Sequence, residues 1–279
     1  MADEAEEEVV FSTSAGPVRV ITAASLFDGH DAAINVMRRL IQSSGAEVIH
    51  LGHDQSAKAV VDCAIQEDAH AVALTSYQGG HVEYFTYIRE LLDEAGCEHV
   101  RIFGGGGGTI TPPEIRTLHQ SGISKIYSPD DGRTMGLMGM IHDLMEKASE
   151  VDLISKERLA TLNGPVTPED MAKVGLLLTL SESADEATLK GYLETCRSST
   201  SEVPVIGFTG TGGAGKSSLL DELMLRIQRD NPGKKVCLLC VDPTRKRTGG
   251  ALLGDRIRMN SLSNNDLYMR SLASRGSGS

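Results

Sequence analysis

Short apolar runs alternate with amphipathic stretches through the first half of the chain. The runs lie at residues 18–23, 47–51, 71–75, 100–103 and 125–127, and the stretches of helical periodicity lie at residues 32–43, 56–68, 81–95, 112–121 and 136–147. Five strands that alternate with five helices are typical of a parallel sheet covered by helices on both faces. We therefore predict a doubly wound, five-stranded α/β domain over residues 17–147, with ligands at the carboxyl ends of its strands.

The strand pattern stops between residues 148 and 203. Thr167 followed by Pro168 is typical of a helix start, with threonine as the cap and proline at the first helical position. A second helical stretch covers residues 187–197, before a polar run. We predict a helical linker here.

A new α/β unit begins at Pro204 and extends to residue 279. Its pattern predicts a strand at 205–209, a glycine-rich loop, a helix at 217–229 and a strand at 235–241, with no convincing strand after Val241. Because two strands leave a sheet with uncovered edges and one uncovered face, we expect this unit to be truncated and the chain to be a piece of a longer protein.

The composition places the chain among globular proteins. Hydrophobic residues make up 40% and charged residues 23%, which is enough to bury a core and argues against global disorder. No apolar run approaches the roughly 20 residues of a membrane span, so no membrane partner is expected. The first eight residues hold five acids and no apolar segment, unlike a presequence. We predict a disordered acidic tail over residues 1–16 and a cytoplasmic protein.

The net charge of −11 is unevenly distributed. Residues 225–279 contain eleven Lys and Arg against four Asp and Glu, a local charge of +7 that leaves −18 on residues 1–224. An acidic body argues against nucleic acid as the main partner. The basic end fits a phosphorylated ligand, a surface that an acidic segment covers, or an ordinary solvated face.

The five cysteines do not suggest a disulfide framework, because their spacing is irregular. Cys237 and Cys240 form a C-x-x-C in an apolar, strand-like run. Residues three apart on a strand point to opposite faces, so the pair cannot share a metal. We expect buried structural thiols.

The segment from Gly210 to Ser217 matches G-x-x-x-x-G-K-[ST] between a predicted strand and helix, the context of a phosphate-binding loop. Glycines allow positive φ and bring backbone N–H groups close to phosphate oxygens. Lys216 is the expected catalytic residue, reaching the β- and γ-phosphates, and the Ser217 hydroxyl is expected to bind Mg²⁺. The predicted nucleotide-binding residues in this loop are Gly210, Gly212, Gly213, Ala214, Gly215, Lys216, Ser217 and Ser218.

Asp242 closes the next predicted strand, where it could hold the metal or cap a turn before Pro243. No N-K-x-D motif follows to read guanine, so the residues alone leave the choice between GTP and ATP open.

Three predicted strand ends in the first domain carry polar or glycine-rich sequences. They are Asp28-Gly-His30, residues 76–80 and residues 104–108. A lone Asp-x-His could also be a helix cap, but the glycine-rich ends beside it predict a crevice for a large flat or elongated ligand.

These residues resemble the Asp-x-His-x-x-Gly, Ser-x-Leu and Gly-Gly signatures of base-off cobalamin-binding domains, which are flavodoxin-like. The resemblance implies that His30 ligates cobalt and that Asp28 accepts a hydrogen bond from its other ring nitrogen. It also implies a pocket for the nucleotide tail beside the serine and glycines. The implied cofactor-binding residues are Asp28, Gly29, His30, Asp31, Ser76, Gln78, Gly80, Gly104, Gly105 and Gly106. The chain departs from the pattern at Ala33 and Gln78, and Ala24 stands where some mutases have lysine.

The order of the domains extends the resemblance to nearly all residues from about 17 to 279. The stretches that start at Asp242 and Gly249 are similar to G-protein chaperones of cobalamin mutases, and a cobalamin domain followed by such a chaperone resembles the fused isobutyryl-CoA mutases. The resemblance implies adenosylcobalamin, GTP and Mg²⁺ as cofactors. It places Asp242 and Asp255 near Mg²⁺ and Arg258 near the nucleotide phosphates.

The same resemblance implies an activity for the intact protein. It would interconvert isobutyryl-CoA and butyryl-CoA by radical chemistry, and its GTPase would gate cobalamin loading. Acyl-CoA would bind only to the full-length protein, in a barrel beyond residue 279, so this fragment is not expected to be a mutase alone. A homodimer and a cobalamin adenosyltransferase are further implied partners. The alternatives are a corrinoid carrier for methyl transfer and a P-loop metallochaperone.

Overall fold

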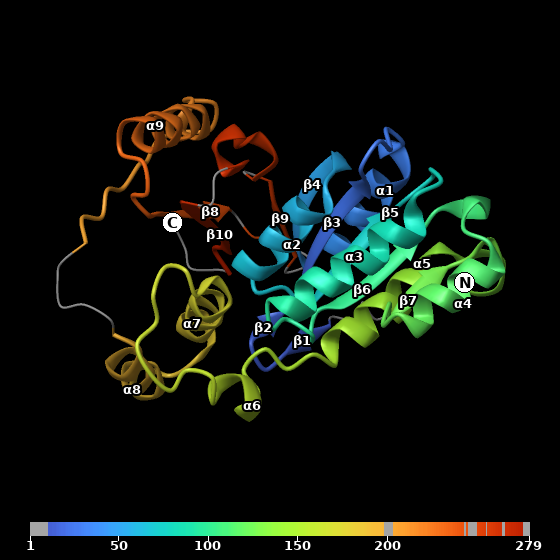
Figure 1. The fold of residues 1–279 in the computed structure, drawn as a ribbon, viewed down its shortest axis with the longest axis horizontal. Coiled ribbons are helices and arrows are strands. Elements are labelled where there is room, and N and C mark those ends of the chain that lie inside the picture. Colours follow the sequence, from blue (N-terminus) through green and yellow to red (C-terminus); the bar gives the residue numbers. More distant parts are fainter. Residues whose placement is uncertain are drawn as a thin grey trace, which may run out of the picture.

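The computed structural model describes residues 11–197, 203–242, 244, 250–254, 256–263 and 266–275. A parallel sheet with helices on both sides occupies one half of the molecule (Figure 1). In the other half, the linker helices of residues 156–196 lie beside residues 203–275, here called the nucleotide-loop segment. None of the helices in the described ranges has the length and apolar character that crossing a bilayer requires.

The main sheet confirms the predicted α/β class. Its strands from the first domain are β3 (Arg19–Ser25), β4 (Glu47–Gln55), β5 (Ala71–Thr75), β6 (Arg101–Gly105) and β7 (Lys125–Tyr127). All neighbouring pairs are parallel, in the order β7-β6-β5-β3-β4. This is the flavodoxin-like order, in which the chain direction across the sheet reverses between β3 and β5.

Helices cover both faces of the sheet, as predicted. They are α1 (Asp31–Ser43), α2 (Ala57–Gln66), α3 (His81–Glu94), α4 (Pro112–Gln120) and α5 (Pro129–Ser149), with a short 3-10 turn η1 (Gly107–Thr109) before α4. Alternate residues of a strand face opposite sides. Accordingly, Ile21 packs in the core with α2, α3 and α4, whereas Val20 packs in the core with α1 and α5.

The predictions for the start and for the last helix of the first domain need correction. Residues 12–16, expected in a disordered tail, belong to a small antiparallel pair of β1 (Ser12–Thr13) and β2 (Gly16–Pro17), while residues 1–10 lie outside the described ranges. Helix α5 begins at Pro129 rather than Gly136, because Ser128 caps it by accepting from the Asp131 N–H. Gly136, with φ 68°, kinks the helix instead of starting it.

The linker is helical, as predicted, with α6 (Lys156–Leu159), α7 (Met171–Ser183) and α8 (Glu186–Cys196). The predicted start at Thr167 is wrong, because Asp170 is the N-terminal cap of α7. The Asp170 carboxylate accepts hydrogen bonds from the backbone N–H and the hydroxyl of Thr167. Residues 167–170 therefore form a separate turn ahead of the helix.

The nucleotide-loop segment differs most from its prediction. It contains α9 (Lys216–Asp230), β8 (Val236–Asp242), β9 (Ala251–Leu253), β10 (Leu267–Ala273) and the 3-10 turns η2 (Arg256–Arg258) and η3 (Asn260–Ser263). The predicted strand at 205–209 is wrong: these residues carry no strand assignment and are exposed. Their apolar character favours a strand, but a strand needs a hydrogen-bonding neighbour, and β8 pairs in parallel with β10.

The expectation of no strand after Val241 is also wrong. Besides β10, the three residues of β9 pair in parallel with β4 and extend the first domain's sheet from five strands to six. Periodicity could not show this, because three residues are too short for a pattern.

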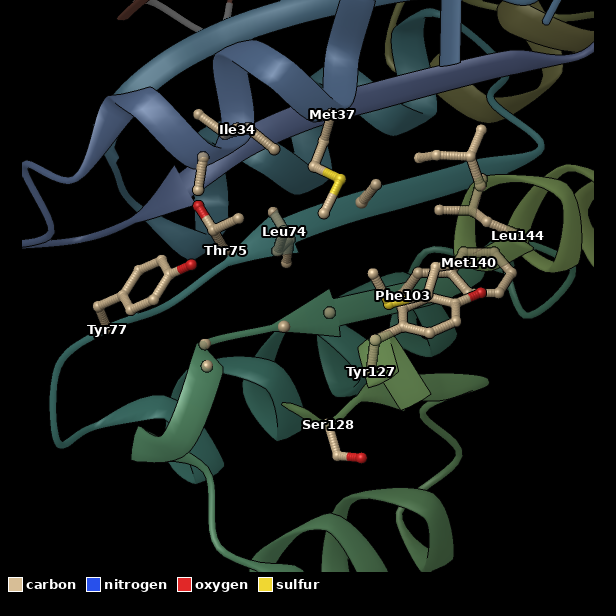
Figure 2. Close-up of a pocket in the computed structure, with 18 of the residues that line it drawn as sticks. Ile34, Met37, Leu74, Thr75, Tyr77, Phe103, Tyr127, Ser128, Met140 and Leu144 are labelled. Atoms are coloured by element: carbon tan, nitrogen blue, oxygen red, sulfur yellow. The ribbon is translucent and has the colours of Figure 1, made fainter. Parts of the chain in front are cut away.

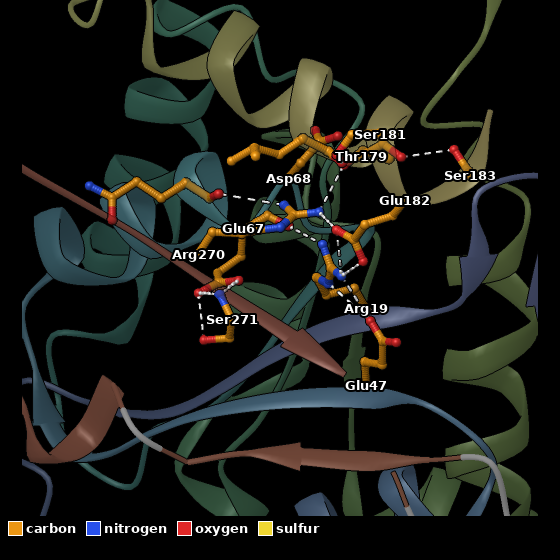
Figure 3. Close-up of polar contacts among 12 residues, drawn as sticks. Arg19, Glu47, Glu67, Asp68, Thr179, Ser181, Glu182, Ser183, Arg270 and Ser271 are labelled. Atoms are coloured by element: carbon orange, nitrogen blue, oxygen red, sulfur yellow. Dashed lines mark hydrogen bonds and ion pairs between the residues drawn. The ribbon is translucent and has the colours of Figure 1, made fainter. Parts of the chain in front are cut away.

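A buried cluster of arginines and carboxylates joins the two halves at the amino ends of β3 and β4 (Figure 3). The Arg19 guanidinium lies 2.8 Å from the Glu47 carboxylate and 3.3 Å from Glu182 of α7. Arg270 of β10 lies 2.7 Å from Glu182, and Arg275 lies 2.7 Å from Glu47. The cluster thus ties the chain's last described residues to the first domain.

Candidate functional site

The candidate site lies where the strand order of the sheet reverses. Strands β3 and β5 are parallel neighbours, so the loops that follow them, residues 26–30 and 76–80, leave the same edge of the sheet. The glycines at the end of β6 lie beside them, since β6 pairs with β5. The structure therefore brings the three predicted strand ends together, as expected for ligand binding at a switch point.

Asp28 and His30 form a tight pair in the first of these loops. Asp28 is 1% exposed, and its Oδ1 lies 2.8 Å from the His30 Nδ1 and 2.9 Å from the His30 backbone nitrogen. An ionised carboxylate only accepts, so Nδ1 must carry a proton, and in the neutral imidazole the lone pair is therefore on Nε2. The His30 side chain is 73% exposed. The pair therefore presents an oriented imidazole to solvent with Nε2 ready to bind a metal.

The carboxylate of Asp28 is held in its charged form. Burial raises its pKa, but hydrogen bonds from the backbone N–H groups of His30 and Tyr77 and from the His30 ring outweigh burial, so the net pKa is lowered. The Tyr77 N–H donates to Asp28 Oδ2 over 2.6 Å. A charged Asp28 therefore holds the orientation of the imidazole it contacts.

Ser76 and Gly106 bring two loops into close contact. Ser76 is fully buried, and its hydroxyl accepts a hydrogen bond of 2.8 Å from Ser25. A Cβ placed on Gly106 would lie 1.9 Å from the Ser76 carbonyl oxygen, so no larger residue fits there without movement of the backbone. A Cβ on Gly104 would lie 2.5 Å from the Phe85 ring. These two glycines are therefore required by packing.

A mostly apolar cavity of about 260 Å³ opens next to these loops. Figure 2 shows Ile34 and Met37 of α1 on one side and Phe103 and Tyr127 on the other. Its lining includes all three predicted glycines, Gly104, Gly105 and Gly106. Ala33, which replaces the last glycine of the resembled motif, lines it as well. Ser76 does not line it, but its neighbours Thr75 and Tyr77 do.

The remaining predicted residues of the site lie in the loops around His30 or at the starts of helices α1 and α3. Gln78 donates from its amide to the Leu26 carbonyl and so holds the loop that contains His30. Gly80 is the N-cap of α3, and Gly29 has open space around its Cα. Asp31 is the first residue of α1.

Sequence reasoning missed Tyr77 and most of the apolar lining. The Tyr77 ring lies 5.3 Å from the His30 ring, centroid to centroid. The helical spacing of Ile34, Met37 and Ile41 was a usable signal, because residues three and four apart lie on one face of a helix. That pattern fits an ordinary core equally well, so it did not mark a cavity.

The phosphate loop has its predicted backbone form. Gly213 and Gly215 have φ of 78° and 85°, and α9 begins at Lys216. The Lys216 ammonium donates to the carbonyls of Gly210 and Thr211 over 2.8 Å and 3.1 Å. It thus lies over the loop, where it could exchange these carbonyls for phosphate oxygens.

The other residues predicted to bind nucleotide or metal lie on α9, β8 and η2 or outside the described residues. Ser217 follows Lys216 in the first turn of α9, with exposed Ser218 beside it, and Asp242 is the last residue of β8. Arg258 is exposed on η2, whereas Asp255 lies outside the described residues. Within the described ranges, no group of three or more His, Cys, Asp or Glu side chains could enclose a metal ion.

The C-x-x-C pair behaves mostly as predicted. Cys240 is buried and Cys237 is exposed, so the two point to opposite faces of β8. The expectation that both thiols are buried is wrong for Cys237, because its side chain lines an open pocket that β8 shares with α7 and α8.

Comparisons with known proteins identify both parts of the chain. The B12 binding domain family matches residues 18–130, and the methylmalonyl Co-A mutase-associated GTPase MeaB family matches residues 174–279. The fused isobutyryl-CoA mutase of Geobacillus kaustophilus is 51% identical over 93% of this chain and 24% of its own length. That of Nocardia farcinica is 53% identical, again over 93% of this chain and 24% of its own length.

The 2-hydroxyisobutanoyl-CoA mutase small subunit of Aquincola tertiaricarbonis is 34% identical over 41% of this chain and 82% of its own length. The chain therefore spans about a quarter of the fused relatives but most of this small subunit. The chain thus contains a B12 binding domain followed by a MeaB GTPase region, and it is a homologue of the fused isobutyryl-CoA mutases.

Proposed function

We propose that the chain binds adenosylcobalamin with His30 as the lower axial ligand of cobalt, as the cofactor-binding part of an acyl-CoA mutase. The observation that carries this proposal is the pair of buried Asp28 and exposed His30, whose Nδ1 is held 2.8 Å from the carboxylate. That contact fixes the tautomer with a free Nε2.

The residues around this pair fit the rest of the cofactor. The apolar cavity lined by Gly104, Gly105 and Gly106 suits the ring of the nucleotide tail. When bound, adenosylcobalamin supplies homolysis of a cobalt–carbon bond, the source of radicals for carbon-skeleton rearrangement. The chain's own role is to ligate, to orient and to keep water from the lower face.

The further parts of the proposal concern the longer protein. We propose that it interconverts isobutyryl-CoA and butyryl-CoA, and that the region around Lys216 binds GTP with Mg²⁺ to gate cobalamin loading. Ser217, Asp242 and Asp255 would hold the metal and Arg258 would approach the phosphates. Similarity to the fused isobutyryl-CoA mutases and the match to the MeaB GTPase family support these statements. A homodimer, delivery by an adenosyltransferase and a cytoplasmic location stay predictions.

A visible-spectrum titration tests the central proposal. Hydroxocobalamin added to the chain should shift to the base-off form with histidine bound, and His30→Ala should abolish that shift. His53→Ala is the matched control, because His53 is an exposed histidine on the neighbouring β4. Unchanged binding and spectrum in His30→Ala would refute the proposal.

A further inference from the structure

The loop between β3 and His30 contains an aromatic residue in an unusual backbone conformation. The Asp28 N–H donates to the Ser25 carbonyl over 3.0 Å, which closes a four-residue turn. Phe27, the third residue of this turn, has φ 63°. Positive φ at the third position alone is the pattern of a type II turn, which favours glycine or asparagine there. A bulky side chain in this conformation is an outlier.

Side chains from the end of β4 and from the loop after β5 hold this conformation. The Phe27 N–H donates to the Asp54 carboxylate over 2.7 Å, and the Gln78 amide donates to the carbonyl of the preceding Leu26. Asp28, the following residue, is buried and accepts from Tyr77. Backbone strain that the surroundings enforce in this way is typical of functional sites.

Folding does not explain why the residue is phenylalanine. Its side chain is 81% exposed, so the ring contributes little to the core. A single exposed apolar residue is ordinary by itself. The positive φ, however, favours glycine at this position, so glycine is the more favourable residue for the isolated fold.

Phe27 belongs to the same loop as the proposed cobalt ligand. Phe27 precedes Asp28 directly, and His30 in the same loop is 73% exposed. The Tyr77 ring, from the loop after β5, packs against His30. The proposed metal ligand thus has one aromatic ring packed against it, and a second, exposed aromatic residue lies three positions earlier in its own loop.

We propose that Phe27 packs its ring against the lower face of the corrin macrocycle, as a positioning residue beside the axial ligand His30. The inference rests on the proposed function. An imidazole that binds cobalt from below places its own loop under the macrocycle, which is a broad and partly apolar surface. Aromatic rings bury large areas on such surfaces at little cost in conformational entropy. Asp54 acts through Phe27, because it fixes the backbone from which the ring projects.

The deciding variant is Phe27→Gly, because it removes the ring and allows the backbone to keep its conformation. Glycine accepts positive φ without strain, so the melting temperature should stay within about 2 °C of wild type. The dissociation constant for hydroxocobalamin, measured by visible titration, should rise by about tenfold, the effect of losing one partly buried aromatic contact. The spectrum of the bound form should still show histidine coordination. Phe27→Tyr should restore affinity, since it keeps the ring.

Other results would overturn the inference in recognisable ways. Affinity of Phe27→Gly within twofold of wild type would mean that the ring faces something else, such as another polypeptide segment. A large fall in melting temperature together with weaker binding would assign Phe27 a structural role. His30→Ala distinguishes these from failure of the underlying proposal: if that variant keeps the wild-type spectrum, the coordination itself is refuted, whatever Phe27 does.

Discussion

The buried carboxylate of Glu47 predicts a specific dependence of stability on pH. Glu47 is fully buried, and its two oxygens contact Arg19 and Arg275, at 2.8 Å and 2.7 Å. Burial raises its pKa, but the two guanidinium groups outweigh burial and lower it from 4.5 to about 2. A carboxyl whose pKa is lowered on folding stabilises the fold above its unfolded pKa, and this contribution is lost as the pH falls.

The magnitude follows from the two pKa values. A difference of about 2.5 pKa units corresponds to about 3 kcal/mol of folding free energy at neutral pH. Between pH 6 and pH 3.5 the unfolded chain takes up a proton at this position and the folded chain does not, so about 1.4 kcal/mol is lost. Glu47→Gln removes the titration. It should also destabilise the protein by about 3 kcal/mol at pH 7, because Arg19 loses its main buried partner.

Urea unfolding of wild type and Glu47→Gln at pH 6 and pH 3.5 measures this effect. The gap in unfolding free energy between the two proteins should narrow by about 1.4 kcal/mol at the lower pH. Glu222→Gln is the control, because Glu222 pairs with Arg226 on the exposed surface of α9 and should change stability by less than about 0.5 kcal/mol at either pH. A gap that stays constant with pH would refute the low pKa of Glu47.

Three further predictions concern the candidate sites. Gly106→Ala should destabilise the fold by about 2 kcal/mol, since its Cβ would lie 1.9 Å from the Ser76 carbonyl oxygen. Gly105→Ala, whose Cβ would have its nearest contact at 3.6 Å, should change the unfolding free energy little. Equal losses of unfolding free energy in the two variants, measured with urea, would contradict this prediction. Lys216→Ala should weaken Mg²⁺–GTP binding at least about tenfold in a fluorescent-nucleotide titration and leave the cobalamin spectrum unchanged. Lys190→Ala of α8 is the control. Undiminished nucleotide binding by Lys216→Ala would count against the assignment of the phosphate loop. A thiol reagent should label Cys237 in the native protein and the other four cysteines only after denaturation. Rapid labelling of Cys240 in the native state would show that β8 is packed differently.

The sequence alone determined the first domain and the identity of both motifs. Parallel strands buried on both faces read as short apolar runs, so the five strands and five helices of residues 17–147 were visible in the pattern. The chemistry of Asp28 and His30 was equally local, because the two side chains belong to one loop and contact each other directly. The positive φ of Gly213 and Gly215 likewise follows from the loop motif itself.

Only the tertiary structure decided the features that depend on partners distant in the sequence. Pairing of β9 with β4 joins residues some 200 apart, and the exposed segment at 205–209 has strand-like composition without a strand beside it. Tyr77, the apolar cavity and the partners of Glu47 are likewise set by which elements meet in space. A periodic pattern records which face of an element is apolar. It does not record which other element covers that face, since many partners bury the same area equally well.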